Sequence, residues 1–294
     1  MPSTTRGTLT LAEEQPRTPR QRRATALLVV LAVGAVAVAA WLGARHLLRA
    51  VTSEQCRVTV AGSTFEWAPD QASNSAAITA IALQRGLPPR AASIAIATAM
   101  QESKVRNIRF GDRDSLGLFQ QRPSQGWGTA EQILDPEYST NKFYDELVKV
   151  DGYASMDIAQ AAQAVQRSAA GEAYAQHEAQ ARATASALSG QSPAAVGCAL
   201  RDPKTKGDSA ALVALLAKDT GLQAATRGST VTVRTGSEDL AWAVGAWAVA
   251  RATDTGATAV TVGGREWQRA LDDSAFGWHP ASTPADPTTV TIHL

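Results

Sequence analysis

The sequence predicts a mainly helical domain with an inserted loop or hairpin, followed by a small α/β domain and preceded by a single transmembrane helix. Three observations support this fold class. An uncharged apolar run lies near the N-terminus. Small apolar residues recur at helical intervals through the middle of the chain. After about residue 208, β-branched runs alternate with helical segments.

Length and charge limit the number of domains and the kinds of partner that the chain can have. A chain of 294 residues is long enough for one or two domains with their own cores. Its formal net charge is only +1, and the body has no long basic run. Because nucleic-acid binding depends on clustered positive charge, we expect no nucleic-acid partner.

The apolar segment Ala24–Ala44 carries no charge and would form a helix about 31 Å long, close to the hydrocarbon thickness of a bilayer. It predicts a membrane anchor. A cleaved signal peptide is the alternative, since Ala37–Ala39 has the small residues of a cleavage site. The charge bias keeps residues 1–23 in the cytoplasm and places the body outside, because most of the flanking arginines precede the segment: Arg6, Arg17, Arg20, Arg22 and Arg23.

Cys56 and Cys198 lie far apart in the sequence and are its only cysteines. In the oxidising space that the anchor orientation predicts, we expect them to form a disulfide. Closing so long a loop would contribute roughly 4–5 kcal/mol in the loop-entropy treatment. Two free buried thiols are the alternative. No Cys-x-x-Cys or Cys/His cluster indicates a metal site, so we expect neither a metal nor a cofactor.

Residues 45–69 are predicted to form a linker with one short strand at Cys56–Val60. The helical domain is expected to span residues 70–200, and residues 107–128 within it are rich in glycine and polar side chains, which predicts a long loop or small hairpin. Helical periodicity and start signals, including Pro89 in a first turn, predict helices over 75–86, 89–103, 157–168 and 172–188, and one beginning at Asp135-Pro136.

A linker at 201–207 is predicted to precede the second domain, residues 208–294. Trp242 and Trp247 are expected to be core residues, whereas Gly277 and Pro280 indicate an exposed loop and leave the placement of Trp267 and Trp278 open. The predicted elements are helices over 209–218 and 237–253 and strands over 229–235, 257–264 and 288–294.

Glu102 ends an alanine-rich helix that has no other acid between Ala91 and Met100. At a helix C-terminus its carboxylate faces the negative end of the dipole, and apolar neighbours disfavour its charge. Both effects favour the protonated carboxyl, which is the form that a general acid requires. Protonation of a glycosidic oxygen needs such a group. A solvated glutamate at a helix end is the alternative that this residue alone leaves open.

The residues after Glu102 fit a saccharide cleft. Gln120 and Gln121 offer amide donors and acceptors for sugar hydroxyl and acetamido groups. Trp127 offers a flat face on which a sugar ring could stack.

Two aspartates lie on the same loop. If Asp112 or Asp114 faced Glu102 across a water-sized gap, hydrolysis with inversion would become possible. The expected role of both is pairing with Arg109 and Arg113, or keeping the loop soluble.

Two motifs in this region resemble a known family. The stretch ATAMQES ends in Glu102-Ser103, and the stretch DSLGLFQ contains Gly117–Gln120. Together they are similar to the two leading motifs of the soluble lytic transglycosylases, which have a lysozyme-like fold and cleave peptidoglycan. The resemblance covers about residues 74–188. The longer stretch GDRDSLGLFQQRPSQGWG looks like an actinobacterial branch of membrane-anchored or secreted proteins with this domain.

The resemblance implies that Glu102 is the single catalytic acid/base. It would protonate the bond between N-acetylmuramic acid and N-acetylglucosamine and then help the C6 hydroxyl of the sugar attack C1, which gives a 1,6-anhydro product. The resemblance also implies that Ser103 orients Glu102 or contacts substrate, and that Gln120 lines the cleft.

The sequence departs from the family at its third motif, an Ala-Tyr-Asn-like stretch. The corresponding residues are Ala164–Gln166, which lack the tyrosine that helps to hold the glutamate. Tyr174 and His177, three residues apart on the last predicted helix of this domain, are expected to be a partly buried packing pair.

The C-terminal region carries a weaker resemblance. The stretch AWAVGAWAVARATDTGATAVTVGGREW and the closing TVTIHL are similar to domains of secreted actinobacterial cell-wall proteins related to zinc D,D-peptidases of the M15 kind. Those close with a His-x-His pair, whereas Thr289 and Thr291 stand at the corresponding positions here. Because an open zinc site needs three protein ligands, we expect this domain to be non-catalytic.

These inferences predict a membrane-anchored, extracytoplasmic lytic transglycosylase whose partner is the glycan strand of peptidoglycan. The alternative is a lysozyme-like domain that binds glycan or serves as a scaffold of the cell wall without turnover. A transporter fits poorly, because one span supplies no pathway.

Overall fold

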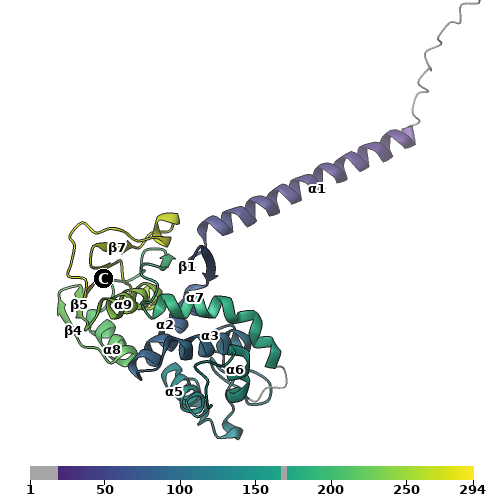
Figure 1. The fold of residues 1–294 in the computed structure, drawn as a ribbon. Helices are drawn as coiled ribbons and strands as arrows, with labels where there is room; N and C mark the ends of the chain where they lie inside the picture. Colours follow the sequence, from purple (N-terminus) through teal and green to yellow (C-terminus); the bar gives the residue numbers. More distant parts are fainter. Residues whose placement is uncertain (1–18, 167–170) are drawn as a thin grey trace, which may run out of the picture. The chain divides into compact units, whose positions relative to one another are not determined.

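The N-terminal apolar segment lies in helix α1, Pro19–Thr52, of the computed structural model (Figure 1). The structure describes residues 19–166 and 171–294, without the side chains of 19–27, 45–52, 171 and 172, so most of the predicted tail falls outside the described residues. The side chains of residues 28–44 are exposed, with Leu28 and Val36 among the most exposed. In the part of the chain whose side chains are described, no helix has both the length and the hydropathy needed to cross a membrane, and the predicted span begins ahead of that part, at Ala24.

Residues 54–294 form one compact unit, and α1 belongs to a separate one. At the centre of the helical part lies α3, Pro89–Ser103, whose residues from Ala91 to Ala99 are all buried. Its small side chains let neighbouring helices approach closely. Those that pack against it are α2 (Pro69–Gln84), α5 (Pro136–Leu147), α6 (Ile158–Gln166), the 3₁₀ helix η2 (Gly171–His177) and α7 (Glu178–Leu188).

The helices begin and end largely where the sequence signals place them. Pro89 starts α3, and the Asp135 carboxylate accepts a hydrogen bond from the Glu137 amide at the start of α5. The predicted helix over 172–188 is wrong in its first half, which is the 3₁₀ helix η2. Two further short helices connect the loop to α5, namely η1 (Pro123–Gln125) and α4 (Ala130–Ile133).

The predicted linker over residues 45–69 contains a hairpin of two strands, β1 (Gln55–Val60) and β2 (Ser63–Trp67). Ala61 and Gly62, both at positive φ, make the tight turn between them. Strand β3, Val196–Ala199, adds to β1 and completes a three-stranded antiparallel sheet in the order β2-β1-β3. Strands β2 and β3 were not predicted from the sequence.

The predicted disulfide is confirmed. Cys56 on β1 pairs in register with Cys198 on β3, and their sulfur atoms are bonded, which closes a loop of sequence separation 142. Disulfides persist in oxidising compartments, so this bond indicates that the body is extracytoplasmic.

The C-terminal part is a six-stranded antiparallel sheet packed against α9, Glu238–Ala250, and α8, Ser209–Thr220. The short α10, Ala252–Thr255, follows α9. The strand order is β4-β5-β9-β6-β7-β8, made by β4 (Ala224–Arg227), β5 (Thr230–Arg234), β6 (Ala259–Val262), β7 (Arg265–Gln268), β8 (His279–Pro280) and β9 (Thr289–His293).

The tryptophans of this part are all core residues. Trp242 and Trp247 on α9 are buried, as predicted. Trp267 and Trp278, whose placement the sequence left open, are also buried, and the exposed loop suggested by Gly277 does not carry them outward. Both indoles donate to backbone carbonyls: Trp267 to that of Ala275 in the 3₁₀ turn η3 (Asp273–Phe276), and Trp278 to that of Val196 on β3.

A charged network of the C-terminal part contacts the helical part through Ser73 on α2. The Arg251 guanidinium donates to the Asp219 carboxylate at 2.6 Å and to Asp254 at 3.1 Å. Ser73 on α2 also donates to Asp254, and the Trp247 indole donates to Asp219. The predicted division at residues 201–207 therefore lies inside a single compact unit (Figure 1).

Candidate active site

Glu102 lies in the last turn of α3, as the sequence predicts, and is half-buried. The chain turns sharply behind it, because Lys104 and Val105 both adopt the left-handed conformation. Two side chains of α2 hold this turn: the Gln71 amide donates to the Lys104 carbonyl at 2.8 Å, and the Asn74 amide to the Val105 carbonyl at 2.8 Å. A non-glycine turn of this kind is strained and persists only where its surroundings fix it. Here it fixes the position of Glu102.

A tyrosine hydroxyl holds the Glu102 carboxylate. Tyr174 is fully buried on η2, and its hydroxyl donates to Oε1 of Glu102 at 2.6 Å. This contact gives Tyr174 a role beyond the packing that the sequence predicts for it. The sequence did not predict this contact, because the two residues are 72 positions apart and come from different elements.

The other carboxylate oxygen remains available. Within the described part of the chain, Tyr174 is the one hydrogen-bond partner of Glu102, and no arginine or lysine is paired with it. One oxygen is therefore oriented by a buried donor while the other can reach a ligand. A carboxyl group held in this way is a candidate for proton transfer.

Side-chain hydrogen bonds hold η2 against the end of α3. The Gln101 side-chain oxygen accepts a hydrogen bond from the Gln176 amide at 3.2 Å and contacts Nε2 of His177 at 3.0 Å. Burial lowers the pKa of His177 below its ordinary value, which favours the neutral ring. Because the Gln101 oxygen can only accept, the bond requires the proton on Nε2. These contacts hold the element that carries Tyr174.

Ser103 has a structural role. Its hydroxyl is buried and donates to the Leu118 carbonyl at 2.7 Å, which ties the end of α3 to the inserted loop. This contact differs from the expectation that Ser103 orients Glu102 directly or contacts substrate. A second hydrogen bond holds the next residue of the loop: the Gln166 amide at the end of α6 donates to the Phe119 carbonyl at 2.7 Å.

The two glutamines of the loop differ in their environment. Gln121 is only 2% exposed and donates to the Ser139 carbonyl, so the expectation that it binds substrate is wrong. Its position in the core follows from its isolated bridge to Leu116, which turns the side chain inward. Gln120 is less buried and stays close to the loop backbone, with its amide 3.3 Å from the Phe110 carbonyl and 3.4 Å from the Gly117 carbonyl.

The two aspartates do not gather at Glu102. Asp114 pairs with Arg122 at 2.7 Å and accepts two hydrogen bonds from Ser124. The Arg122 guanidinium, followed by Ser124, holds the pKa of the Asp114 carboxyl below its ordinary value. Asp112 is 93% exposed and lies 3.9 Å from Arg113. Both act within the loop, although the partner of Asp114 is Arg122 and not the expected arginines.

Trp127 is half-buried and lines an open cavity of about 660 Å³. The cavity is bounded by the loop after η1, by the second half of α5 and by the end of α6. Half of its lining residues carry polar side chains, namely Gln125, Lys142, Glu146, Lys149 and Gln166. Glu102 is not among the lining residues, so the cavity and the carboxylate are separate features.

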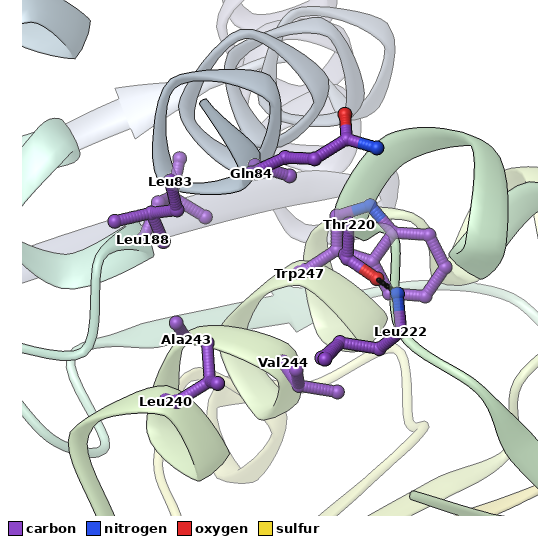
Figure 2. Close-up of a pocket in the computed structure, with 10 residues that line it drawn as sticks. Leu83, Gln84, Leu188, Thr220, Leu222, Leu240, Ala243, Val244 and Trp247 are labelled. Carbon is purple, nitrogen blue, oxygen red and sulfur yellow. Dashed lines mark hydrogen bonds between the residues drawn. The ribbon is translucent and has the colours of Figure 1, made fainter. Parts of the chain in front are cut away.

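A second cavity, of about 220 Å³, lies between α2, α8 and α9 (Figure 2). Leu83, Leu188 and Leu240 face it together with other apolar side chains, and its polar edge is formed by Gln84 and Thr220. The Thr220 hydroxyl is already bonded to the Leu216 carbonyl and to the Leu222 amide. An apolar cavity with so few open polar groups does not suit a saccharide.

No protein-family model matches the chain, and no curated protein is significantly similar to it. The site is therefore interpreted from its own geometry. The site offers one oriented carboxylate, a buried tyrosine donor and a polar cavity lined by the half-buried Trp127.

Proposed function

We propose that this protein is a membrane-anchored, extracytoplasmic lytic transglycosylase of peptidoglycan, with Glu102 as its acid/base. The observation that carries the proposal is the 2.6 Å hydrogen bond from the Tyr174 hydroxyl to Glu102. A lone glutamate at a helix end would usually be solvated. A half-buried glutamate that accepts a hydrogen bond from a buried hydroxyl has a fixed side-chain position, and this is typical of a catalytic carboxyl.

In the proposed reaction Glu102 gives its proton to the glycosidic oxygen as the bond from C1 of N-acetylmuramic acid breaks. The C6 hydroxyl of the same sugar then attacks C1, and its proton passes to the Glu102 carboxylate. The products are a 1,6-anhydro sugar and a free 4-hydroxyl on the leaving N-acetylglucosamine. No water is consumed, so the second carboxylate of an inverting hydrolase is not required.

The anchor and the lysozyme-like fold belong to the same proposal. The apolar side chains exposed from Leu28 to Ala44 on α1 support an uncleaved anchor with a cytoplasmic N-terminus. The central buried α3, ending in a glutamate and surrounded by helices, supports a lysozyme-like arrangement. The C-terminal part is proposed to be non-catalytic, because Thr289 and Thr291 cannot bind zinc and leave β9 with a single histidine, His293, where an open site needs three protein ligands.

A glycan-binding or scaffold protein without turnover is the second candidate. The Gln166 side chain favours it, since this residue of the third motif bonds to the Phe119 backbone instead of facing Glu102. The cavity beside Trp127 would serve binding in either case.

Digestion of purified murein by the full-length chain in detergent tests the proposal. We expect soluble muropeptides with 1,6-anhydro ends by mass spectrometry, and a loss of at least about 100-fold in their release for Glu102→Gln. Anhydro products released equally by Glu102→Gln would overturn the assignment. Reducing ends would indicate a hydrolase. Sedimentation with murein without any release would favour the binding protein.

A further inference from the structure

The cavity beside Trp127 has a distinctive charge pattern. Its charged lining residues are Lys142, Glu146 and Lys149, all on α5 or just after it. Lys149 pairs with Glu146 at 2.6 Å, so these two charges neutralise each other. Lys142 has no carboxylate within salt-bridge distance among the described residues. Its ammonium lies 5.7 Å from the centre of the Tyr138 ring. The cavity therefore keeps one uncompensated positive charge.

The cavity has the size and surfaces of a ligand site. Its volume of about 660 Å³ falls within the range of small-ligand pockets. Trp127 packs partly against the core, which fixes its indole, and Val150 and Val165 add apolar wall beside it. An aromatic plane next to an unpaired cation suits a ligand that combines a saccharide or other apolar face with a carboxylate.

Two hydrogen bonds connect the cavity wall to the end of α3. Gln166 lines the cavity and holds the Phe119 carbonyl, while Ser103 holds the neighbouring Leu118 carbonyl. Since Glu102 directly precedes Ser103, the helix end that carries the carboxylate and a wall residue of the cavity are both bonded to one short loop segment, Leu118-Phe119. A polymer whose bond lies at Glu102 would place a neighbouring substituent in the cavity.

We propose that the Trp127 cavity is a subsite for the acidic peptide substituent of muramic acid, with Lys142 recognising a free carboxylate of that peptide. This inference rests on the proposed function for its substrate and adds a specificity to it. Glycan strands that carry peptides are bound with higher affinity than bare glycan strands, which offer no carboxylate to this cavity. Lys142 acts on binding and not on the reacting atoms.

A sedimentation experiment separates this inference from catalysis. The full-length Glu102→Gln chain in detergent is mixed with insoluble murein, or with the same murein after an amidase has removed its peptides. We expect tighter binding to the peptide-bearing form. Adding Lys142→Met should weaken that binding roughly tenfold, as expected for loss of one charge-assisted hydrogen bond, and leave binding to bare glycan unchanged.

Two further variants serve as controls. Lys142→Arg keeps the charge and should retain most of the preference. Lys204→Met removes one exposed positive charge from the C-terminal part and should change neither affinity. Thermal unfolding of Lys142→Met, compared with the parent chain, shows whether the fold is intact.

The outcomes are distinct. Equal weakening on both forms of murein, or no effect of Lys142→Met on either, would overturn the subsite. If the wild-type chain releases no muropeptides but the Lys142-dependent preference is found, the transglycosylase proposal fails and the subsite remains. If release is found without this preference, the subsite alone fails.

Discussion

At the scale of single residues, the pairing of Glu102 with Tyr174 distinguishes a positioned carboxyl from a solvated one. The two residues are 72 positions apart in the sequence and come from different elements, α3 and η2. A buried hydroxyl has few alternative partners, so its hydrogen bond to Oε1 restricts the rotamers of Glu102 at little cost in entropy. The hydrogen bond fixes the orientation of the Glu102 carboxyl group and leaves its second oxygen available.

Replacing Tyr174 by phenylalanine should therefore lower turnover more than substrate affinity. We expect kcat for release of anhydro-muropeptides to fall roughly 10- to 100-fold with little change in KM, because the proton donor loses its orientation and not its substrate contacts. Steady-state kinetics on murein measure both quantities.

Tyr144→Phe is the matched control, because Tyr144 is also fully buried and its hydroxyl donates to a backbone carbonyl, that of Ile78, at 2.9 Å. It should cost about 1 kcal/mol of stability and leave kcat unchanged. Equal effects of the two substitutions on kcat would show that Tyr174 acts only through the fold.

At the scale of elements, the site depends on a short 3₁₀ segment. Seven residues, Gly171–His177, form η2, which is too short to be stable without tertiary contacts. Its contacts to Gln101 at the end of α3 provide such support, and they adjoin Glu102 in the sequence. The same helix end thus carries the carboxylate and holds the element that orients it.

Removing the side chain of Gln101 should loosen η2 without touching the reacting groups. For Gln101→Ala we expect faster hydrogen exchange of the η2 amides and a smaller loss in kcat than for Tyr174→Phe. Mass-resolved exchange and the same murein assay measure the two effects. Unchanged exchange in η2 would contradict this role of Gln101.

A low pH should weaken the contact between His177 and Gln101. Because burial lowers the pKa of His177 below its ordinary value of 6.5, the unfolded chain binds more protons than the folded chain just below that pH. The stability that the neutral ring contributes is present above about pH 6.5 and is lost as the pH falls below it. His177→Gln keeps a donor without titrating, so it should remove this pH dependence of exchange in η2.

At the scale of the whole molecule, the helical part and the C-terminal part form one compact unit, and a buried ion pair of the C-terminal part lies where it contacts α2. Arg251 and Asp219 are both largely buried, with exposed side-chain fractions of 13% and 4%. Their pairing links α9 to α8, and the contact of Arg251 with Ser73 extends it to α2. Loss of either partner would leave a buried charge unpaired.

Arg251→Met should therefore destabilise the whole body. We expect a loss of about 3–5 kcal/mol in a single unfolding transition, measured by chemical denaturation and followed by tryptophan fluorescence and circular dichroism. Arg182→Met is the control, since Arg182 is 62% exposed and pairs with Glu178 on the surface, where such pairs contribute less than about 1 kcal/mol. Two separate transitions in the parent chain would contradict the single unit.

Local signals in the sequence predict most of the helices but few of the short strands. Pro89 and the Asp135 cap mark helix starts through backbone chemistry that needs no tertiary context. Strands β2, β3, β4, β7 and β8 have at most five residues, and such segments are stable only through partners elsewhere in the chain. For the same reason Trp267 and Trp278 could not be placed from their glycine- and proline-rich surroundings.

The sequence by itself determined the elements whose causes are local: the helix that ends at Glu102, the glycine-rich loop after it, and the two cysteines available for one bond. Only the tertiary structure decided which side chains meet at the carboxylate. Tyr174 reaches Glu102, Gln121 turns into the core, and Asp114 pairs with Arg122. Hydrogen bonds between distant residues depend on how the elements pack, and residue spacing along the chain does not contain that information.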